Sequence, residues 1–471
     1  MLFSTTTFII IFLPIVIAIY YGLLRKIKTL KNIFLFLVSI LFYAWGEPYF
    51  VLVMLVSIIA NWFFGGLVDK YRENKIKVRI VIVLMFIFNL SILGVFKYLN
   101  FIISNTNTFF HTNFVVPNIV LPIGISFFTF QAISYVLDIY KKDAEAQKNP
   151  LNMGLYIAFF PQLIAGPIVR YKTIAEQIEQ RTETFEKFSK GVQRFIKGLA
   201  KKVLLSNSLA IVADYTFGML PSELSVVLAW LGIISYTLQI YFDFSGYSDM
   251  AIGLAKMFGF ELEENFNFPY ISKTITEFWR RWHISLGTWF RDYVYIPLGG
   301  SRVGKKRLVL NLFIVWSLTG LWHGANWTFI AWGIFYFVLL TIEKLTKMDK
   351  NETKNKLINI FKHIYTMFFV MIGWVLFRSD DLGYAIQYIK SLFGFMGNTF
   401  LNAEAILYLR EYGIYMLLGI LFSIPLGKVL QKYRAKKGFK IIYGVATILI
   451  FYVCLSYIIK GTYNPFIYFN F

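Results

Sequence analysis

The stretch LVLNLFIVWSLTGLWHGANWTFIAWGIFYF, residues 308–337, consists of two apolar runs that meet at a short polar segment around His323. Almost no loop separates the two runs, so we expect a pair of antiparallel helices in a membrane, with His323 near the turn. Two arrangements of this pair remain open, because the turn either reaches the outer surface or stops at mid-depth of the bilayer. Both arrangements leave the flanking loops on one side of the membrane.

Apolar runs of membrane length recur along the whole chain of 471 residues. Hydrophobic residues make up 57% of the chain and charged residues only 15%, whereas a soluble domain carries roughly a quarter charged residues. Besides the paired block at 309–342, candidate spans lie at about residues 7–24, 31–46, 49–66, 79–97, 119–139, 203–219, 225–243, 359–377, 412–428 and 440–459. The sequence predicts an all-α polytopic membrane protein with about 10–12 transmembrane helices. We interpret residues 1–471 as a single membrane domain.

The loops between these spans alternate in charge. Basic loops lie at 25–31, 69–79, 141–148, 344–356 and 428–440, whereas the connections at 46–48 and 98–118 are nearly free of lysine and arginine. Basic loops of multi-pass proteins stay on the cytoplasmic side of the membrane. We therefore expect these loops in the cytoplasm and both chain termini outside.

Two further segments predict other kinds of contact with the membrane. Residues 152–168 are apolar but are followed by the basic stretch 170–202, so we expect a re-entrant segment that is broken near Pro161 and Gly166. Within 185–203, apolar residues recur at helical spacing and lysines and an arginine fill the opposite face. This pattern predicts an amphipathic helix on the anionic cytoplasmic surface.

Composition and motifs exclude several classes of function. The formal net charge of +21 comes from basic residues in short loops, which is the pattern of membrane orientation rather than of nucleic-acid binding. The chain has one cysteine, Cys454, and no H-E-x-x-H motif, so we expect no metal site. GGSRVGKK at 299–306 fits a phosphate-binding loop except that Lys306 replaces the hydroxyl residue that binds magnesium. We expect a basic surface loop there.

Polar residues interrupt the apolar pattern in YFDFSGYSDMAIGLAKMFGF, residues 241–260, where Asp243 and Tyr247 are the most prominent. Ionisable groups at membrane depth usually face a cavity or one another, which marks this segment as a candidate substrate pocket. The alternative is a purely structural contact between helices, which Gly246 and Gly253 would permit.

The segment ITEFWRRWHISLGTWFRDYVYIPLGG, residues 275–300, predicts a helix along the membrane surface. At 100° per residue, one face of this helix would carry Trp279, Trp282, His283, Leu286 and Phe290. Tryptophans favour the membrane interface, and the arginines of the opposite face would meet phosphate. His283 lies on the apolar face, where it is either a buried core residue or a functional group.

His323 is the strongest catalytic candidate on residues alone. Trp322 and Asn326 lie beside it, and His283 lies only forty positions earlier in a chain with four histidines. Burial lowers the pKa of a histidine and keeps it neutral, and a neutral imidazole is a competent general base. A buried structural histidine is the alternative, and we assign no role to the other two, His111 and His363.

Four linked motifs between residues 242 and 333 resemble the membrane-bound O-acyltransferase (MBOAT) family, in the branch of bacterial alginate and peptidoglycan O-acetylation proteins. They are FDFSGYSDMAIG, ENFNFPY, ITEFWRRWHISLGTWFRDYVYIPLGG and GLWHGANWTFIAWG. The opening MLFSTTTFIIIFLPIVIAIYY, FYAWGEP at 42–48 and the closing NPFIYFNF are similar to the same branch. The resemblance thus covers nearly the whole chain.

The resemblance implies a helical bundle around a central funnel, with a catalytic core at about 225–345. It implies that His323 of the LWHG motif is catalytic and that His283 is the second family histidine. The residues expected to bind substrate are Asp243, Tyr247, Trp282, Trp322 and Asn326.

Similar proteins of the bacterial cytoplasmic membrane take an acyl group from a cytoplasmic thioester, here acetyl-CoA or another acyl thioester, and deliver it outward. An extracytoplasmic acetyltransferase of the SGNH type and a polysaccharide acceptor are the implied partners. We therefore expect an O-acetyltransferase without a bound cofactor. Three alternatives remain open: D-alanyl transfer to teichoic acid by a related MBOAT protein, a polysaccharide or acyl transporter, and a non-catalytic scaffold.

Overall fold

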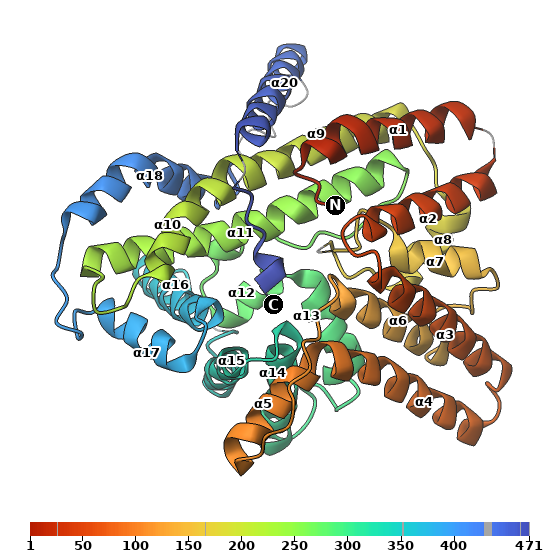
Figure 1. Ribbon diagram of the computed structural model, residues 1–471, viewed down its shortest axis with the longest axis horizontal. Helices are drawn as coiled ribbons and strands as arrows, with labels where there is room; N and C mark the ends of the chain where they lie inside the picture. The colour runs from red at the N-terminus through yellow and green to blue at the C-terminus, as the bar shows by residue number, and fades with distance from the viewer. Residues whose placement is uncertain (26, 165, 351–352, 428–435, 462, 471) are drawn as a thin grey trace. The chain divides into compact units, whose positions relative to one another are not determined.

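The computed structural model describes residues 1–25, 27–164, 166–350, 353–427, 436–461 and 463–470 (Figure 1). In these ranges the chain is helical and contains no β-strand, which confirms the all-α prediction. The predicted basic loop at 428–440 falls largely outside the described residues, as do two positions of the loop at 344–356.

Seven described helical segments are long and apolar enough to cross a membrane. They are α3 (Phe50–Lys70), Lys75–Phe110 with α4 (Lys75–Leu93) and α5 (Leu99–Phe110), α11 (Val226–Met257), α15 (Trp327–Leu345), α16 (Lys356–Arg378), α18 (Ala403–Phe422) and Gly438–Lys460 within α20 (Lys437–Lys460). Two shorter apolar helices are Thr7–Leu23, which contains α1 (Leu13–Ala18), and α6 (Ile125–Tyr140). The chain is therefore a multi-pass membrane protein, as predicted.

The described residues form two compact units. Unit 1 contains Met1–Phe195 and Met250–Glu263, and unit 2 contains Ile196–Asp249 and Glu264–Phe471. In unit 1, α3 packs against α4 and α6, and α2 (Lys28–Ala44) packs against α7 (Pro150–Ala158). The other described α-helices of the two units together are α8 (Tyr171–Gln180), α9 (Phe185–Ala200), α10 (Asn207–Gly218), α12 (Ile275–Arg281), α13 (Ile284–Phe290), α14 (Lys305–His323) and α17 (Leu382–Ser391).

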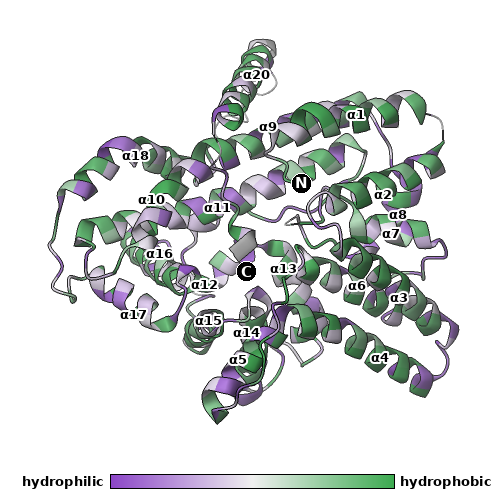
Figure 2. Ribbon diagram, in the orientation of Figure 1, coloured by the Kyte–Doolittle hydropathy of each residue, from purple (hydrophilic) through white to green (hydrophobic). Residues whose placement is uncertain are grey.

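Helices α3 and α4 consist mostly of hydrophobic residues (Figure 2). They expose apolar residues and bury polar ones, which is the inverted polarity of a membrane protein. Leu52 and Ile59 of α3 are exposed, whereas Asn61 is fully buried. The Asn61 amide nitrogen donates to Asn89 Oδ1 of α4 at 3.1 Å, and the Asn89 amide nitrogen donates back at 2.8 Å. Such reciprocal amide bonds hold helices together where apolar packing alone has no advantage over lipid.

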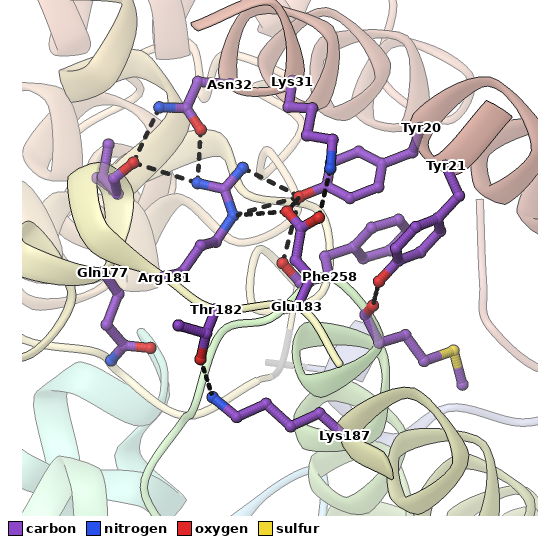
Figure 3. Close-up of polar contacts among 12 residues, drawn as sticks. Tyr20, Tyr21, Lys31, Asn32, Gln177, Arg181, Thr182, Glu183, Lys187 and Phe258 are labelled. Atoms are coloured by element: carbon purple, nitrogen blue, oxygen red, sulfur yellow. Dashed lines mark hydrogen bonds and ion pairs between the residues drawn. The ribbon is translucent and has the colours of Figure 1, made fainter. Parts of the chain in front are cut away.

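A buried charge cluster joins two neighbouring segments of unit 1, around Tyr20 and Lys31, to the distant residues Arg181 and Glu183 (Figure 3). Arg181 Nη1 donates to Asn32 Oδ1 at 2.6 Å, and Arg181 Nη2 donates to Tyr20 Oη at 3.0 Å. Tyr20 Oη in turn donates to Glu183 Oε1 at 2.5 Å, and Lys31 forms an ion pair with the same carboxylate. The polar atoms of this cluster bond to one another, as buried charges require.

The apolar segment predicted to break in the membrane does break. Helix α7 begins at Pro150, where the Asn149 side chain accepts a hydrogen bond from Leu151 N, and it ends at Ala158. Residues 159–164 and 166–169 are irregular yet buried. Non-helical backbone at membrane depth is tolerated only inside protein, and the buried Phe160 N accordingly donates to Ser39 Oγ of α2 at 3.0 Å. The membrane side of its two ends stays a prediction.

Three predicted boundaries were wrong. The span expected at 225–243 continues as α11 to Met257, so the polar residues lie within a helix. The connection expected at 98–118 is helical as far as Phe110, which lies just before the left-handed His111. The span expected at 412–428 is α18, which begins at Ala403, where the Asn402 side chain accepts a hydrogen bond from Ala405 N. Capping residues, rather than apolar periodicity, set the end of α5 at His111 and the start of α18 at Asn402.

Candidate active site

The first element of the site is the short helix α12, whose start is fixed by two carboxylates. Thr274 Oγ1 accepts from Glu277 N at 3.0 Å, and Glu277 Oε2 accepts from Lys273 N at 2.9 Å. The fully buried Glu343 of α15 accepts from Ile275 N at 2.6 Å and from the N and Oγ1 of Thr276 at 2.8 and 2.7 Å. A carboxylate is stabilised by the free N–H groups of a helix N-terminus, so Glu343 fixes α12 against α15.

The single surface helix predicted for 275–300 is wrong, because the chain breaks at His283. Helix α12 ends at Arg281, His283 has a left-handed backbone with φ 44°, and α13 begins at Ile284. Asn265 takes over the backbone donors at the break: its carbonyl accepts from Ile284 N at 2.9 Å, and its Oδ1 accepts from Ser285 N at 3.1 Å. Trp279 and His283 therefore do not share one helix face.

His283 lies in an aromatic environment at this break. Its ring centroid lies 6.3 Å from that of Phe266 and 6.1 Å from that of Trp322. Burial lowers the pKa of His283 to about 4, so the ring is neutral at physiological pH. A left-handed non-glycine residue costs roughly 1–3 kcal/mol, and such strain clusters at functional sites.

His323 is the last residue of α14, and close packing of α14 against α15 buries it. A Cβ at Gly320 would lie 2.5 Å from Phe329 O, and one at Gly333 would lie 2.5 Å from Trp316 O, so only glycine permits this approach. The chain then turns, and Asn326 Oδ1 accepts from Thr328 N at 3.0 Å to begin α15. The predicted helix pair is confirmed, with His323 next to its turn.

Aromatic rings surround His323, which is 8% exposed. Its ring centroid lies 5.0 Å from Trp322, 5.0 Å from Trp332 and 5.1 Å from Phe377. The Trp322 ring thus contacts both His283 and His323. The structure brings together the two predicted catalytic histidines around this one tryptophan, although they come from different segments of unit 2.

A row of aromatic side chains connects His323 with α12. The Trp332 ring lies 5.1 Å from Tyr336 and 5.4 Å from Trp279, and Tyr336 lies 4.9 Å from Trp279. In the part of the chain that the structure describes, Trp279 Nε1, Trp332 Nε1 and Tyr336 Oη are buried without a hydrogen-bond partner. We call these three residues the aromatic row. Unsatisfied buried donors are costly and usually mark a place that water or a polar ligand occupies.

The other predicted site residues have contacts of their own. Asp243 forms a buried ion pair with Lys202 at 2.6 Å and accepts from Ile467 N at 2.9 Å, so it holds the C-terminal segment. The Tyr247 ring lies 5.2 Å from Phe466 in the same segment. The ring contacts of Trp282 include Phe266 at 5.1 Å and Trp374 at 4.9 Å.

Asn326 has a second contact, because its amide nitrogen donates to Asp380 O at 2.9 Å. Within the described ranges, no three histidine, cysteine or acidic side chains lie close enough to hold a metal ion.

Sequence reasoning missed two residues that shape the site, Glu343 and Asn265. Glu343 is an acid within the apolar run of α15, which was a usable signal because a lone carboxylate at membrane depth needs a partner. Asn265 lies in the quoted ENFNFPY motif, but its partners are twenty residues away and no local pattern indicates them.

Comparisons with known proteins identify the family of this chain. A model of the MBOAT, membrane-bound O-acyltransferase, family matches residues 146–378. The protein named "Probable alginate O-acetylase AlgI" of Pseudomonas syringae pv. tomato is 43% identical over 399 residues, covering 84% of this chain and 76% of that protein. The peptidoglycan O-acetyltransferase of Helicobacter pylori is 34% identical over 461 residues, covering 91% of this chain and 87% of that protein.

More distant relatives transfer another acyl group. The teichoic acid D-alanyltransferase of Bacillus subtilis is 31% identical over 278 residues, covering 55% of this chain and 69% of that protein. With identities of this size over most of its length, the chain belongs to the membrane-bound O-acyltransferase (MBOAT) family and is an O-acyltransferase.

Proposed function

We propose that this protein takes an acetyl group from a cytoplasmic thioester and passes it across the membrane for O-acetylation of an exported polysaccharide, with His323 as general base. The observation that carries the proposal is that the buried His323 and His283 both contact the ring of Trp322, beside the aromatic row. The O-acetylating relatives named for alginate and peptidoglycan support an acetyl group and a polysaccharide acceptor.

The proposed reaction begins when a neutral His323 takes the proton of the acceptor hydroxyl. The hydroxyl oxygen then attacks the thioester carbonyl and forms a tetrahedral intermediate, whose oxyanion is stabilised by an N–H donor of the neutral His283 ring. The C–S bond breaks, and the departing thiolate takes the proton from His323. General-base catalysis of this kind contributes about 10²–10⁴-fold to the rate.

The aromatic row suits the donor in this reaction. The arm of a thioester donor carries carbonyl oxygens, which accept hydrogen bonds. Trp279 Nε1, Trp332 Nε1 and Tyr336 Oη are hydrogen-bond donors in the aromatic row between α12 and His323. We propose acetyl-CoA or another acyl thioester as the donor, and Trp282, Trp322 and Asn326 as walls of the pocket. Asp243 and Tyr247 act one step further away, through the C-terminal segment that they hold.

In the cell, the basic loops would lie in the cytoplasm and both termini outside a bacterial cytoplasmic membrane. An extracytoplasmic acetyltransferase of the SGNH type would complete delivery to the polysaccharide. Residues 1–471 would act as one membrane domain with its catalytic core at about 225–345.

The decisive experiment uses purified protein in liposomes with labelled acetyl-CoA and a soluble glycan acceptor. We expect His323→Ala to lower acetyl transfer and release of free CoA by about 10²–10⁴-fold, with an unchanged unfolding temperature. His111→Ala is the matched control, because His111 is exposed in a turn after α5. Full activity of His323→Ala would remove the histidine from the mechanism.

D-alanyl transfer is the second candidate, because the teichoic acid D-alanyltransferase of Bacillus subtilis is 31% identical. The same assay separates the two reactions when a D-alanyl thioester replaces acetyl-CoA. A transporter or scaffold would release no thiol from either donor in a histidine-dependent way.

A further inference from the structure

A polar pocket of about 480 Å³ lies beside α12, at the end of α15 that is remote from His323. Thr276, which lines the pocket, bonds to Glu343, and Glu343 lies sixteen residues after Trp327 at the start of α15. At 1.5 Å per residue, α15 separates this pocket from the turn next to His323 by about 24 Å. The pocket is therefore distinct from the site where the acyl group is transferred.

The lining of this polar pocket is positively charged. Its cations are Lys273, Arg280 and Lys362, and its carboxylates are Glu277 and Asp349.

Each carboxylate of the pocket already has a counter-ion outside the lining. Glu277 Oε1 lies 2.9 Å from Arg281 Nη2, and Asp349 Oδ2 lies 2.5 Å from Lys344 Nζ. By contrast, the exposed Lys273 and Arg280 have no ion pair in the described part of the chain. Two cations that are accessible and not neutralised favour a phosphate or another anion.

An apolar groove of about 460 Å³ adjoins the polar pocket, because Lys273 lines both. Helix α11 contributes Ile234 and Leu238 to the groove, α16 contributes Met367 and Met371, and α18 contributes Ile420. All three helices are candidate membrane spans, so the groove lies where lipid chains are available. The unbranched methionines adapt to an irregular apolar occupant.

We propose that the groove and the pocket together bind one anionic phospholipid. Its acyl chain would fill the groove between α11, α16 and α18, and its headgroup phosphate would lie between Lys273 and Arg280. Charge complementarity selects this occupant, because a neutral lipid would leave both cations unsatisfied. A soluble thioester donor would fill only the polar pocket and leave the apolar groove empty. The predicted cytoplasmic position of the neighbouring loop 344–356 matches the leaflet that carries anionic lipids.

The test measures lipid retention by the full chain. Protein is exchanged into nanodiscs of phosphatidylcholine with a minor fraction of phosphatidylglycerol, and bound phosphatidylglycerol is counted by native mass spectrometry. We expect wild type to retain one phosphatidylglycerol, and K273Q/R280Q to weaken its binding by about 30-fold. Both substituted side chains are exposed, so the variant is expected to fold.

The control variant is K75Q/K77Q, which removes two exposed lysines from another predicted cytoplasmic loop. It should retain the lipid as wild type does, since those lysines adjoin no apolar groove among the cavities described. Equal loss in both variants, or no loss in either, would overturn the proposal. If K273Q/R280Q weakens the binding of added acetyl-CoA but retains the lipid, the proposal is also overturned and the pocket is assigned to the donor.

A second variant, Met367→Trp, fills the groove and leaves both cations in place, so it should lower retention of the lipid. Unchanged retention would contradict the proposed position of the acyl chain.

Discussion

The charge cluster of unit 1 and the histidine site of unit 2 are both buried, but they differ in how many of their polar atoms have hydrogen-bond partners. In the cluster, Arg181, Glu183 and Tyr20 bond to one another over about 160 positions of sequence (Figure 3). In the site, the aromatic row contains three polar atoms without a partner in the described residues. A satisfied network stabilises a fold, whereas unsatisfied donors cost stability and need a functional reason.

The largest effect on stability is expected from breaking the satisfied cluster. Arg181→Met removes the partner of Asn32 and Tyr20 and weakens the charge balance of Glu183, and breaking a buried pair costs about 3–5 kcal/mol. We expect a clearly lower unfolding temperature in detergent, with normal acetyl transfer per folded molecule. Lys187→Met is the control, because its partly exposed ion pair with Glu261 should contribute about 1 kcal/mol or less. If both variants unfold alike, the cluster is not the stabilising element.

The next effect is a dependence of stability on pH that arises from His283. The pKa of His283 is about 4 in the folded state and about 6.5 in the unfolded state. The unfolded chain therefore binds more protons than the folded chain between pH 4 and pH 6.5. Stability from this residue is fully present above pH 6.5 and is lost as the pH falls toward 4.

Chemical unfolding of wild type and His283→Gln across this range checks the prediction. The stability difference between the two proteins should depend on pH from 6.5 to 4 and be constant above 7. The control variant is His111→Gln, which replaces an exposed histidine at the end of α5. A constant difference between wild type and His283→Gln at all pH values would contradict the burial of His283.

The smallest effect on stability, and the sharpest contrast, comes from removing one hydroxyl from each region. Tyr336→Phe deletes a buried hydroxyl without a described partner, so stability should stay within about 1 kcal/mol or rise, while acetyl transfer falls. Tyr20→Phe deletes a hydroxyl that bonds to Glu183 and Arg181, so it should cost about 1–3 kcal/mol and leave activity per folded molecule intact. Unfolding curves and initial rates measured on both variants decide whether the two regions differ as described.

Much of the fold was predictable because long runs of apolar residues identify membrane helices in a sequence. The pair α14 and α15 was expected from two apolar runs and a short polar turn, and His323 lies beside that turn as predicted. The break of the segment after α7 was also predictable, since Pro161 and Gly166 interrupt an apolar run between basic stretches. Local sequence sufficed for the helix pair because backbone in lipid must satisfy its hydrogen bonds within a helix. It sufficed for the break because proline and glycine disfavour the interior of a helix.

The shape of the site was not predictable in the same way. Periodicity suggested one amphipathic helix across 275–300, but Asn265 bonds to the backbone at Ile284 and Ser285 and stops it. Glu343 fixes the start of α12 from a distance of about 67 residues. The contacts of Asp243 with Lys202 and with Ile467 N were likewise not predictable from the local pattern, and its role in substrate binding stays a prediction.

By itself, the sequence determined that this chain is a helical multi-pass membrane protein, that its polar anomalies gather between residues 242 and 333, and that two histidines stand out there. Only the tertiary structure decided that both histidines contact Trp322, that a left-handed residue separates α12 from α13, and which buried polar atoms find partners. The physical reason is range: hydropathy and helix formation depend on neighbours in sequence, whereas buried hydrogen bonds are made between segments whose proximity exists only after folding.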